Sequence, residues 1–506
     1  MTESVGIRNT RRWIIILVAL IVSGLGYPLF LFTTTVFRAD LPIEEIQELS
    51  NSWQHDIHFK IPIYLEVPTT LVDLVSTSQE SFDKKLEQVY PSISKFWSVE
   101  FHTNVENISS ATDLVVKIEQ QTNDAVTVES YHVSPFDKEV ILYITDKTIE
   151  NRGLEDFLVT ILINEVFREE IYQFLSVTSE NTGEEGEVSA IMPYSPKFNI
   201  VFSLFVENGV EIDWEIEKSL ELFKPLLSKL NHFANFSLAS QVQYYSKLSK
   251  DVKFNEEEKT YVLSQSDLTT FINFGDWNLF THDINPTINF IIFFPASNYE
   301  NKRWTIEGSK KNSFLVPQWG GVHIFNKDLP LIDTSKVSIT ENELTPVLEI
   351  FSSQLFQLLG FVKSPKSPSI RIDTLSRVTT FKNLKQTFES LNSLIKVTNS
   401  LTEISIPNLT KEYVIKSLEF ANETLSVLNN NQDYLKSVTL SSLSLKNSDS
   451  AFFEKEMLQQ AYFPSEHKYA VFLPLLGPVG SIIFIGVLKM ISDIKKERKE
   501  KKEKVD

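Results

Sequence analysis

The first candidates for catalysis or metal binding are eight histidines, of which only His55 and His58 lie close together. The H-x-x-H spacing places two imidazoles on one face of a helix, or diagonally to one another in an extended segment. No neighbouring carboxylate completes a zinc pattern such as H-E-x-x-H. We therefore expect a surface or packing role for this pair and predict no metal site.

The chain contains no cysteine, which excludes disulfides, a thiolate nucleophile and cysteine-ligated metals. It also lacks a G-x-S-x-G elbow, a P-loop and a G-x-G-x-x-G fingerprint. Acidic pairs such as Glu169/Glu170 and Glu184/Glu185 are typical of solvated surface. The sequence predicts no catalytic residue, no cofactor and no metal ligand.

One short block, residues 317–322 (P-Q-W-G-G-V), joins a polar stretch to an apolar one. Paired glycines permit a tight backbone path, and the neighbouring Trp319 can lie across it or project outward. A structural turn with a buried indole is the favoured interpretation. A recognition surface is the alternative.

Two apolar stretches without a charged residue, residues 13–32 and 469–488, bracket the rest of the chain. Each has roughly the 20 residues with which a helix crosses a hydrocarbon core of about 30 Å. We expect both to be transmembrane helices. The first exceeds the h-region of a signal peptide, about 7–15 residues, and no A-x-A-like site follows it. An uncleaved anchor is therefore favoured over a cleaved signal.

Charge at the ends predicts the orientation of these spans. Residues 1–12 carry +2 and residues 489–506 carry +3 of a formal net charge of −18, which leaves −23 between the spans. Short segments rich in Lys and Arg remain in the cytoplasm. We expect two cytoplasmic tails and one large lumenal loop, too acidic to attract nucleic acid.

Four N-x-[ST] sequons fall inside the expected lumenal loop, at Asn107, Asn235, Asn408 and Asn422. Such triplets arise by chance, but their placement fits a translocated loop that receives N-glycans. At the C-terminus, Lys502 and Lys504 match a K-x-K-x-x retrieval signal of the endoplasmic reticulum. A lysine-rich solvated tail is the equally weighted alternative.

The loop changes character along its length. Residues 33–337 alternate helical patterns with apolar runs typical of strands covered on both faces. The predicted strands are residues 59–67, 126–133, 140–145, 198–206, 288–294 and 322–325, and the predicted helices include residues 71–90 and 154–175. This alternation predicts an α/β domain with a mixed sheet.

Residues 338–468 are predicted to be mainly helical. Thr340 and Glu343 have capping-box spacing, apolar residues follow at three- and four-residue steps, and Gly360 is a plausible stop. Similar stripes lie within residues 384–395 and 414–428. We expect ordinary intramolecular packing of these helices, with a partner groove as the alternative. No sequence repeat is evident.

Two motifs resemble a known family. Residues 33–42 (T-T-T-V-F-R-A-D-L-P) are similar to the T-T-x-x-Y-R-A-x-L-P segment of the PIG-S family, a subunit of the glycosylphosphatidylinositol (GPI) transamidase. The W-G-G block, with Phe314, Pro317 and Asn326, resembles that family's second block. Phe37 replaces the family's tyrosine, so the phenolic hydroxyl is lost while an aromatic packing role is expected to persist.

The resemblance implies a non-catalytic subunit in the endoplasmic reticulum membrane, associated with a chain that supplies the cysteine–histidine pair. It would support the attachment of preassembled GPI anchors to the C-terminal ends of proproteins. The family-motif and interface candidates are Thr33, Thr34, Arg38, Leu41, Pro42, Trp319, Gly320 and Gly321. A membrane-tethered glycan-modifying hydrolase with two carboxylates and a lumenal cargo or lipid receptor are the alternatives.

Overall fold

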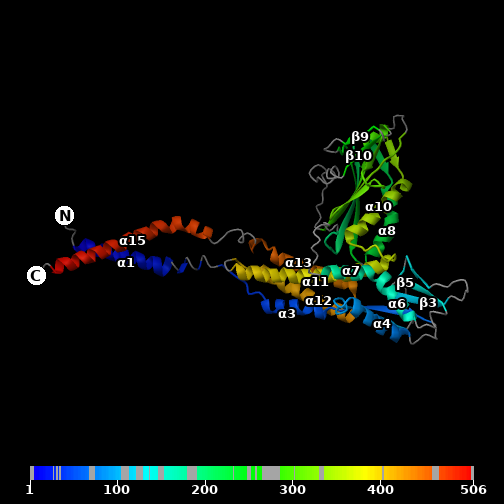
Figure 1. Cartoon of the computed structure of the whole chain (residues 1–506). Coiled ribbons are helices and arrows are strands. Elements are labelled where there is room, and N and C mark those ends of the chain that lie inside the picture. The colour runs from blue at the N-terminus through cyan, green and yellow to red at the C-terminus, as the bar shows by residue number, and fades with distance from the viewer. Residues whose placement is uncertain are drawn as a thin grey trace. The chain divides into compact units, whose positions relative to one another are not determined.

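The computed structural model describes the chain between residues 5 and 502 (Figure 1). The residues outside the description are 1–4, 27, 30–31, 33–35, 68–73, 104–112, 121–128, 136, 146–152, 179–190, 232, 248–251, 257–258, 265–284, 301, 330–335, 402–403, 458–465 and 503–506. The chain divides into two compact units. The first comprises Met1–Ser50, Thr387–Leu418 and Lys446–Asp506, and the second comprises Asn51–Gln386 and Glu419–Leu445.

The second unit begins with a five-stranded sheet in the order β2-β1-β3-β5-β4. Its strands are β1 (Phe59–Glu66), β2 (Trp97–His102), β3 (Leu114–Gln120), β4 (Ser130–Val133) and β5 (Glu139–Ile144). Four strands are parallel, and β4 is antiparallel to β5. Helix α4 (Leu74–Val89) packs against β2 and against α6 (Leu154–Ile161).

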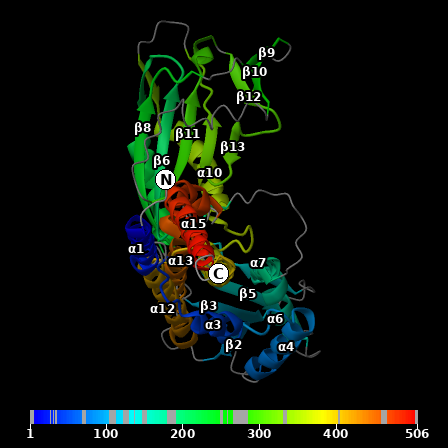
Figure 2. The same ribbon diagram turned by 90° about the vertical axis from the view of Figure 1, so that its left-hand side faces the viewer.

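A second five-stranded sheet has the order β13-β14-β11-β6-β8, visible in Figure 2. Its strands are β6 (Lys197–Val206), β8 (Asn235–Gln243), β11 (Thr287–Phe294), β13 (Ser313–Val316) and β14 (Gly320–Ile324). Helices α8 (Ile216–Leu230) and α10 (Glu341–Leu359) contribute to the core on one face. On the other face, Ile291 and Phe293 pack with Trp304 and Ile306. Coverage on both faces explains the continuous apolar runs in the sequence.

The two sheets share one topology. In each sheet, the strand that comes first in the sequence (β1 or β6) has two neighbours. One is the strand that follows the next helix along the chain (β2 or β8), and the other is the strand of that sheet that comes next in the sequence (β3 or β11). The last parallel strand (β5 or β14) follows, with an antiparallel strand at the edge (β4 or β13). The repeat is one of topology, which explains why no sequence period reveals it.

Smaller strands complete the second unit. Strands β9 (Lys253–Asn255), β10 (Thr260–Leu263) and β12 (Arg303–Ile306) form one sheet, and β7 (Glu211–Trp214) pairs in parallel with β15 (Lys336–Ile339).

The remaining long helices are α3 (Ile43–Asp56), α7 (Arg168–Thr178), α11 (Pro368–Ser400), α12 (Asn408–Asn431) and α13 (Tyr434–Phe452).

The α/β class with a helical C-terminal part is confirmed, and so are the predicted ends of α10. Glu343 accepts a hydrogen bond from the Thr340 backbone N–H at 2.9 Å, and Gly360 ends the helix with φ = 84°. The helix predicted over residues 154–175 is interrupted by a π-helical turn, Leu162–Val166, and by non-helical Phe167. Residues 71–73 and 126–128 of two predicted elements lie outside the described residues.

The terminal segments contain helices α1 (Val5–Ile21), continued by the π-helical turn Val22–Gly26, and α15 (Glu466–Lys502). Among the described residues, no helix combines the length and the hydropathy that a membrane span requires. The two transmembrane helices therefore stay a prediction, as do the domain boundaries at residues 337 and 468.

Candidate assembly interface

The described part of the first family block is held against the end of α11. Ala39 N–H donates to the carbonyl of Ile406 at 2.8 Å, and Ile406 N–H donates to the carbonyl of Phe37 at 3.0 Å. The Arg38 guanidinium donates to the carbonyls of Thr398 at 2.6 Å and Leu401 at 3.0 Å. Carbonyls in the last turn of a helix lack intrahelical partners and carry partial negative charge. Arg38 therefore caps α11.

The rest of this block has mixed placement. Leu41 is buried, and the carbonyl of Pro42 accepts the first helical hydrogen bond of α3, from Ile46 N–H at 3.1 Å. Thr33 and Thr34 lie outside the described residues. Phe37 is 59% exposed, so the expected packing of its ring is not seen among the described residues.

The second block forms a turn between β13 and β14 with a buried indole, as expected. Gln318 adopts a left-handed conformation (φ = 56°), and Trp319 is 8% exposed within an apolar cluster that contains Phe293. A Cβ atom on Gly320 would lie 1.8 Å from the carbonyl oxygen of Asn289. Glycine at this position therefore allows β14 to pair with β11.

Gly321 also makes room for a neighbour, in this case a side chain. A Cβ atom here would lie 2.0 Å from Gln354 Oε1 on α10. Gln354 Nε2 donates to Ser313 Oγ at 2.9 Å, and Ser313 Oγ donates to the carbonyl of Val322 at 2.8 Å. Neither Gln354 nor Ser313 could be singled out from the sequence, because isolated polar residues in apolar runs have no distinctive spacing.

Asn326, the last residue of the second family block, binds the backbone of β12. Its Oδ1 accepts from Trp304 N–H at 2.9 Å, and its Nδ2 donates to the Trp304 carbonyl at 2.8 Å. The amide thereby acts as a strand partner for Trp304. The second block thus consists of residues that fix strands to one another.

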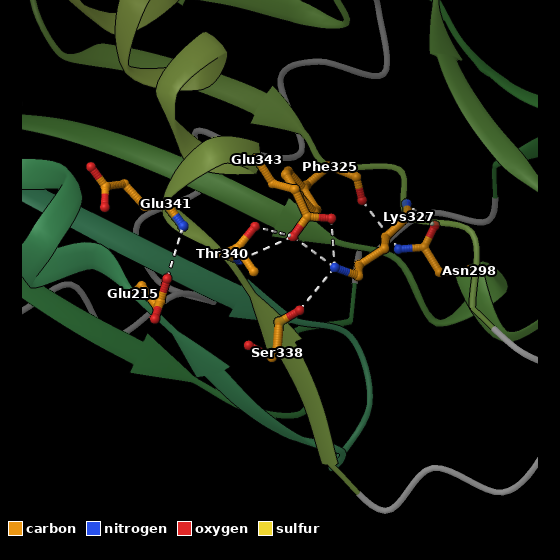
Figure 3. A network of polar contacts seen from close by, with 8 residues as sticks. All are labelled: Glu215, Asn298, Phe325, Lys327, Ser338, Thr340, Glu341 and Glu343. Carbon is orange, nitrogen blue, oxygen red and sulfur yellow. Dashed lines mark hydrogen bonds and ion pairs between the residues drawn. The ribbon is translucent and has the colours of Figure 1, made fainter.

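Charged side chains gather where the parallel strands of the second sheet end, which is where open α/β sheets place their ligands. Glu207 follows β6 and accepts a hydrogen bond from Ala296 N–H, beyond β11, at 2.7 Å. Glu215 accepts from Glu341 N–H at 3.1 Å, at the start of α10 (Figure 3). Lys218 and this N–H lower the pKa of Glu215. Each carboxylate is bound by the chain's own backbone.

Lys327 and Glu343 form the centre of the same network (Figure 3). Lys327 Nζ lies 2.6 and 2.8 Å from the two carboxylate oxygens of Glu343 and donates to the carbonyl of Ser338 at 2.8 Å. Burial opposes ionisation of Glu343, but hydrogen bonds from Lys327 and Thr340 outweigh it and lower the pKa. Ion pairs and helix caps therefore occupy the carboxyl edge of the sheet, where enzymes with an open α/β sheet bind their substrates.

A second charged network is fully buried. The Arg377 guanidinium donates to Glu170 through Nε to Oε1 at 2.7 Å and Nη2 to Oε2 at 2.6 Å. Trp97 Nε1 and Thr374 Oγ1 also donate to this carboxylate, both at 2.8 Å. The prediction of a solvated Glu170 is therefore wrong, because three polar residues on other elements, Arg377, Trp97 and Thr374, compensate its burial.

No cluster of three or more metal-ligating side chains exists among the described residues. His55, in α3, and His58, just after it, are both exposed.

A family model described as phosphatidylinositol-glycan biosynthesis class S protein matches residues 17–497. The chain belongs to the PIG-S family. It is 29% identical over 526 residues to the GPI transamidase component GPI17 of Saccharomyces cerevisiae, covering 98% of this chain and 94% of that protein. It is 24% identical to the GPI-anchor transamidase component PIGS of Homo sapiens (96% of each chain) and of Rattus norvegicus (95% of each).

Three sequons of this PIG-S family chain present exposed asparagines, namely Asn235 on β8 and Asn408 and Asn422 on α12. Asn107 lies outside the described residues. Exposure is compatible with glycans at the three described positions, and their occupancy stays a prediction.

Proposed function

We propose that this PIG-S family chain is a non-catalytic structural and recognition subunit of a GPI transamidase in the endoplasmic reticulum. In this role it supports the attachment of preassembled GPI anchors to the C-terminal ends of proproteins. Support comes from the family match over residues 17–497 and from relatives named as GPI transamidase components.

One observation carries the non-catalytic part of the proposal. At the carboxyl edge of the second sheet, Glu207, Glu215 and Glu343 are each held by backbone N–H groups of the chain itself. A general base must reach a proton on the substrate within hydrogen-bond distance. Carboxylates committed to helix starts serve structure, and a sequence without cysteine supplies no catalytic thiolate, so we assign the cysteine–histidine pair to another subunit.

The proposed anchorage is double-pass, with both termini cytoplasmic and the acidic loop lumenal. Residues 13–32 and 469–488 supply the apolar length, and the basic tails supply the orientation. Within the first unit, Arg11 on α1 forms an ion pair with Asp493 on α15. A Cβ atom on Gly486 would lie 3.2 Å from Ile15 Cγ1, so the two helices approach closely there.

The test compares assembled complexes that contain the wild-type chain, Glu207→Gln, Glu215→Gln or Glu343→Gln. The rate of proprotein conversion is normalised to the amount of assembled complex. We expect every normalised rate to stay within about twofold of wild type, since general acid–base catalysis is worth roughly 10²–10⁴-fold. A loss of about 100-fold in one variant that folds and assembles normally would show that the chain is catalytic.

A further inference from the structure

We infer that four exposed apolar side chains at one end of the helices α11, α12 and α13 form a surface that lies on the lumenal leaflet of the membrane. They are Phe37, Leu401, Leu409 and Phe453. We call this set the apolar end patch. The inference goes beyond the proposed function and rests on the double-pass anchorage included in it.

The course of the chain brings the residues of the patch to one end of these helices. Helix α11 ends at Ser400 and α12 begins at Asn408, so the short connection holds Leu401 and Leu409 together at that end. Helix α13 runs toward the same end, since Asp449 Oδ1 in its last turn accepts a hydrogen bond at 3.1 Å from Ser390 Oγ, ten residues before the end of α11.

Segments beside the patch are fixed to the same end. Thr410 Oγ1, in the first turn of α12, lies 3.7 Å from Met457 Sδ, beyond the end of α13. The Phe37 carbonyl accepts hydrogen bonds from Ile406 N–H and from Ser405 Oγ, both at 3.0 Å, and Ala39 N–H donates to the Ile406 carbonyl.

All four side chains face solvent to a degree unusual for their type. Phe37 is 59% exposed, Phe453 60%, Leu401 44% and Leu409 44%. Phe453 stays exposed although its ring contacts Phe452 edge-on, with centroids 5.0 Å apart. Grouped apolar exposure marks an interaction surface, whereas scattered single residues need no explanation.

The identity of the partner follows from the tethers. Phe37 lies five residues beyond the end of the first apolar stretch, a path that spans at most about 18 Å when fully extended. Phe453 precedes the second apolar stretch, which begins at residue 469. The first tether is short enough to keep the end that carries the patch close to the lipid surface once the span is anchored, and the second tether leaves from the same end of the helices.

The chemistry of the patch suits the headgroup region. Aromatic side chains are enriched at the interface between membrane and water. The guanidinium of the neighbouring Arg38 is directed at helix carbonyls, so the patch itself presents rings and aliphatic groups. A shallow apolar contact with lipid is therefore favoured over electrostatic binding to anionic lipid.

The test uses the absence of cysteine from the full chain. Single variants Phe37→Cys, Leu401→Cys, Leu409→Cys and Phe453→Cys are labelled with an environment-sensitive fluorophore. The purified chain is reconstituted in phosphatidylcholine vesicles with or without doxyl-labelled phosphatidylcholine. The control is Leu435→Cys, since Leu435 is 41% exposed and lies at the other end of α13.

Doxyl lipid should quench labels at patch positions by about twofold or more, because a surface contact places them within about 5–10 Å of the acyl boundary. The Leu435→Cys label should be quenched little. The four sites are independent, so a variant that misfolds leaves three others. Accessibility of patch labels to aqueous iodide equal to that of the control would overturn the inference. So would an apolar environment without quenching by lipid, which would indicate a protein contact instead.

Alkaline carbonate extraction of the same vesicles separates the two proposals. Release of the chain by carbonate would overturn the anchorage itself. A chain that resists extraction while its patch labels report water would overturn only the membrane contact of the patch.

Discussion

Glu170 and Arg377 bind each other through two hydrogen bonds of 2.7 and 2.6 Å in a site that excludes solvent from both side chains. Burial alone would lower the pKa of Arg377, but the charge of Glu170 and its hydrogen bonds raise it above the ordinary value. The pair joins α7 to α11, and Tyr434 of α13 stacks on the guanidinium with 4.9 Å to its ring centroid.

Removing either charge should destabilise the chain strongly. Glu170→Gln or Arg377→Met leaves one buried charge without compensation, and each should lower the free energy of unfolding by about 3–5 kcal/mol. The double variant should cost clearly less than the sum of the two. Urea denaturation of the full chain in detergent measures all three values, and strictly additive costs would contradict the pairing.

The two glycines of the W-G-G block should respond differently to alanine. Gly320→Ala brings a methyl group against the backbone of Asn289, so we expect a loss of at least about 3 kcal/mol. Gly321→Ala meets only the Gln354 side chain, and Gln354→Ala in the same chain should restore part of the stability. Gly308→Ala is the control, because no atom lies near its Cβ position and only φ = 79° opposes it, at about 1 kcal/mol.

Those stabilities come from urea denaturation as well. Rescue of Gly320→Ala by Gln354→Ala would show that the new methyl group meets the Gln354 side chain and not the backbone of Asn289. Equal costs at positions 308 and 320 would mean that strand pairing tolerates the methyl group.

His323, on β14, should make stability depend on pH. Burial lowers the pKa of His323 from 6.5 to about 4, so between these values the unfolded chain binds a proton that the folded chain does not. Stability contributed by the neutral imidazole is complete above pH 6.5 and is lost as pH falls towards 4. The loss should reach roughly 3 kcal/mol, at about 1.4 kcal/mol for each pKa unit.

Unfolding free energies of wild type and His323→Gln, compared at several pH values, isolate this contribution. The difference between the two proteins should shrink as pH falls from 6.5 to 4. A difference independent of pH would show that His323 takes up protons equally in both states.

Arg38 should hold the end of α11 and the strand segment beside it. Charge-assisted hydrogen bonds contribute about 1.5–3 kcal/mol each, so Arg38→Ala should release the pairing of residues 37–39 with residues 404–406. Hydrogen exchange at the Ala39 and Ile406 amides should accelerate, with partial protection in Arg38→Lys. Asp40→Asn, at an exposed neighbouring position, is the control and should leave both amides protected.

Pairing of the terminal helices depends on Arg11 and Asp493. Arg11→Asp or Asp493→Arg alone places like charges together, whereas the double exchange restores attraction. Disulfide formation between Ile15→Cys and Gly486→Cys, free of competition from native thiols, reports the approach of the helices. We expect a fall in cross-linking in each single reversal and recovery in the double one. Unchanged cross-linking throughout would show that packing alone holds the helices.

Local patterns predicted much of the fold. Continuous apolar runs identified β6 and β11 almost to the residue, because parallel strands covered on both faces leave no alternation. The Thr340–Glu343 spacing located the start of α10, because a capping box is a local structure. Short edge strands such as β13 carry too few residues for a period, and the shared order of the two sheets is a non-local property.

The same limit applies to the candidate sites. The sequence singled out Trp319-Gly320-Gly321 as a tight turn with an aromatic neighbour, and it singled out Arg38 through the resemblance of residues 33–42 to a family motif. It could not show that Arg38 meets carbonyls some 360 residues later, or that Glu170 meets Arg377 across more than 200 residues. Contacts between residues so far apart in the sequence produce no local pattern. For this reason the acidic pair Glu169/Glu170 was interpreted as ordinary solvated surface.

Co-purification of the full chain from membranes in mild detergent, with mass measurement of the intact assembly and identification of its subunits, tests the central claim most directly. We predict a stable complex of fixed stoichiometry that includes a second chain with a cysteine–histidine catalytic pair. Recovery of this chain as a lone, stable monomer would contradict the account.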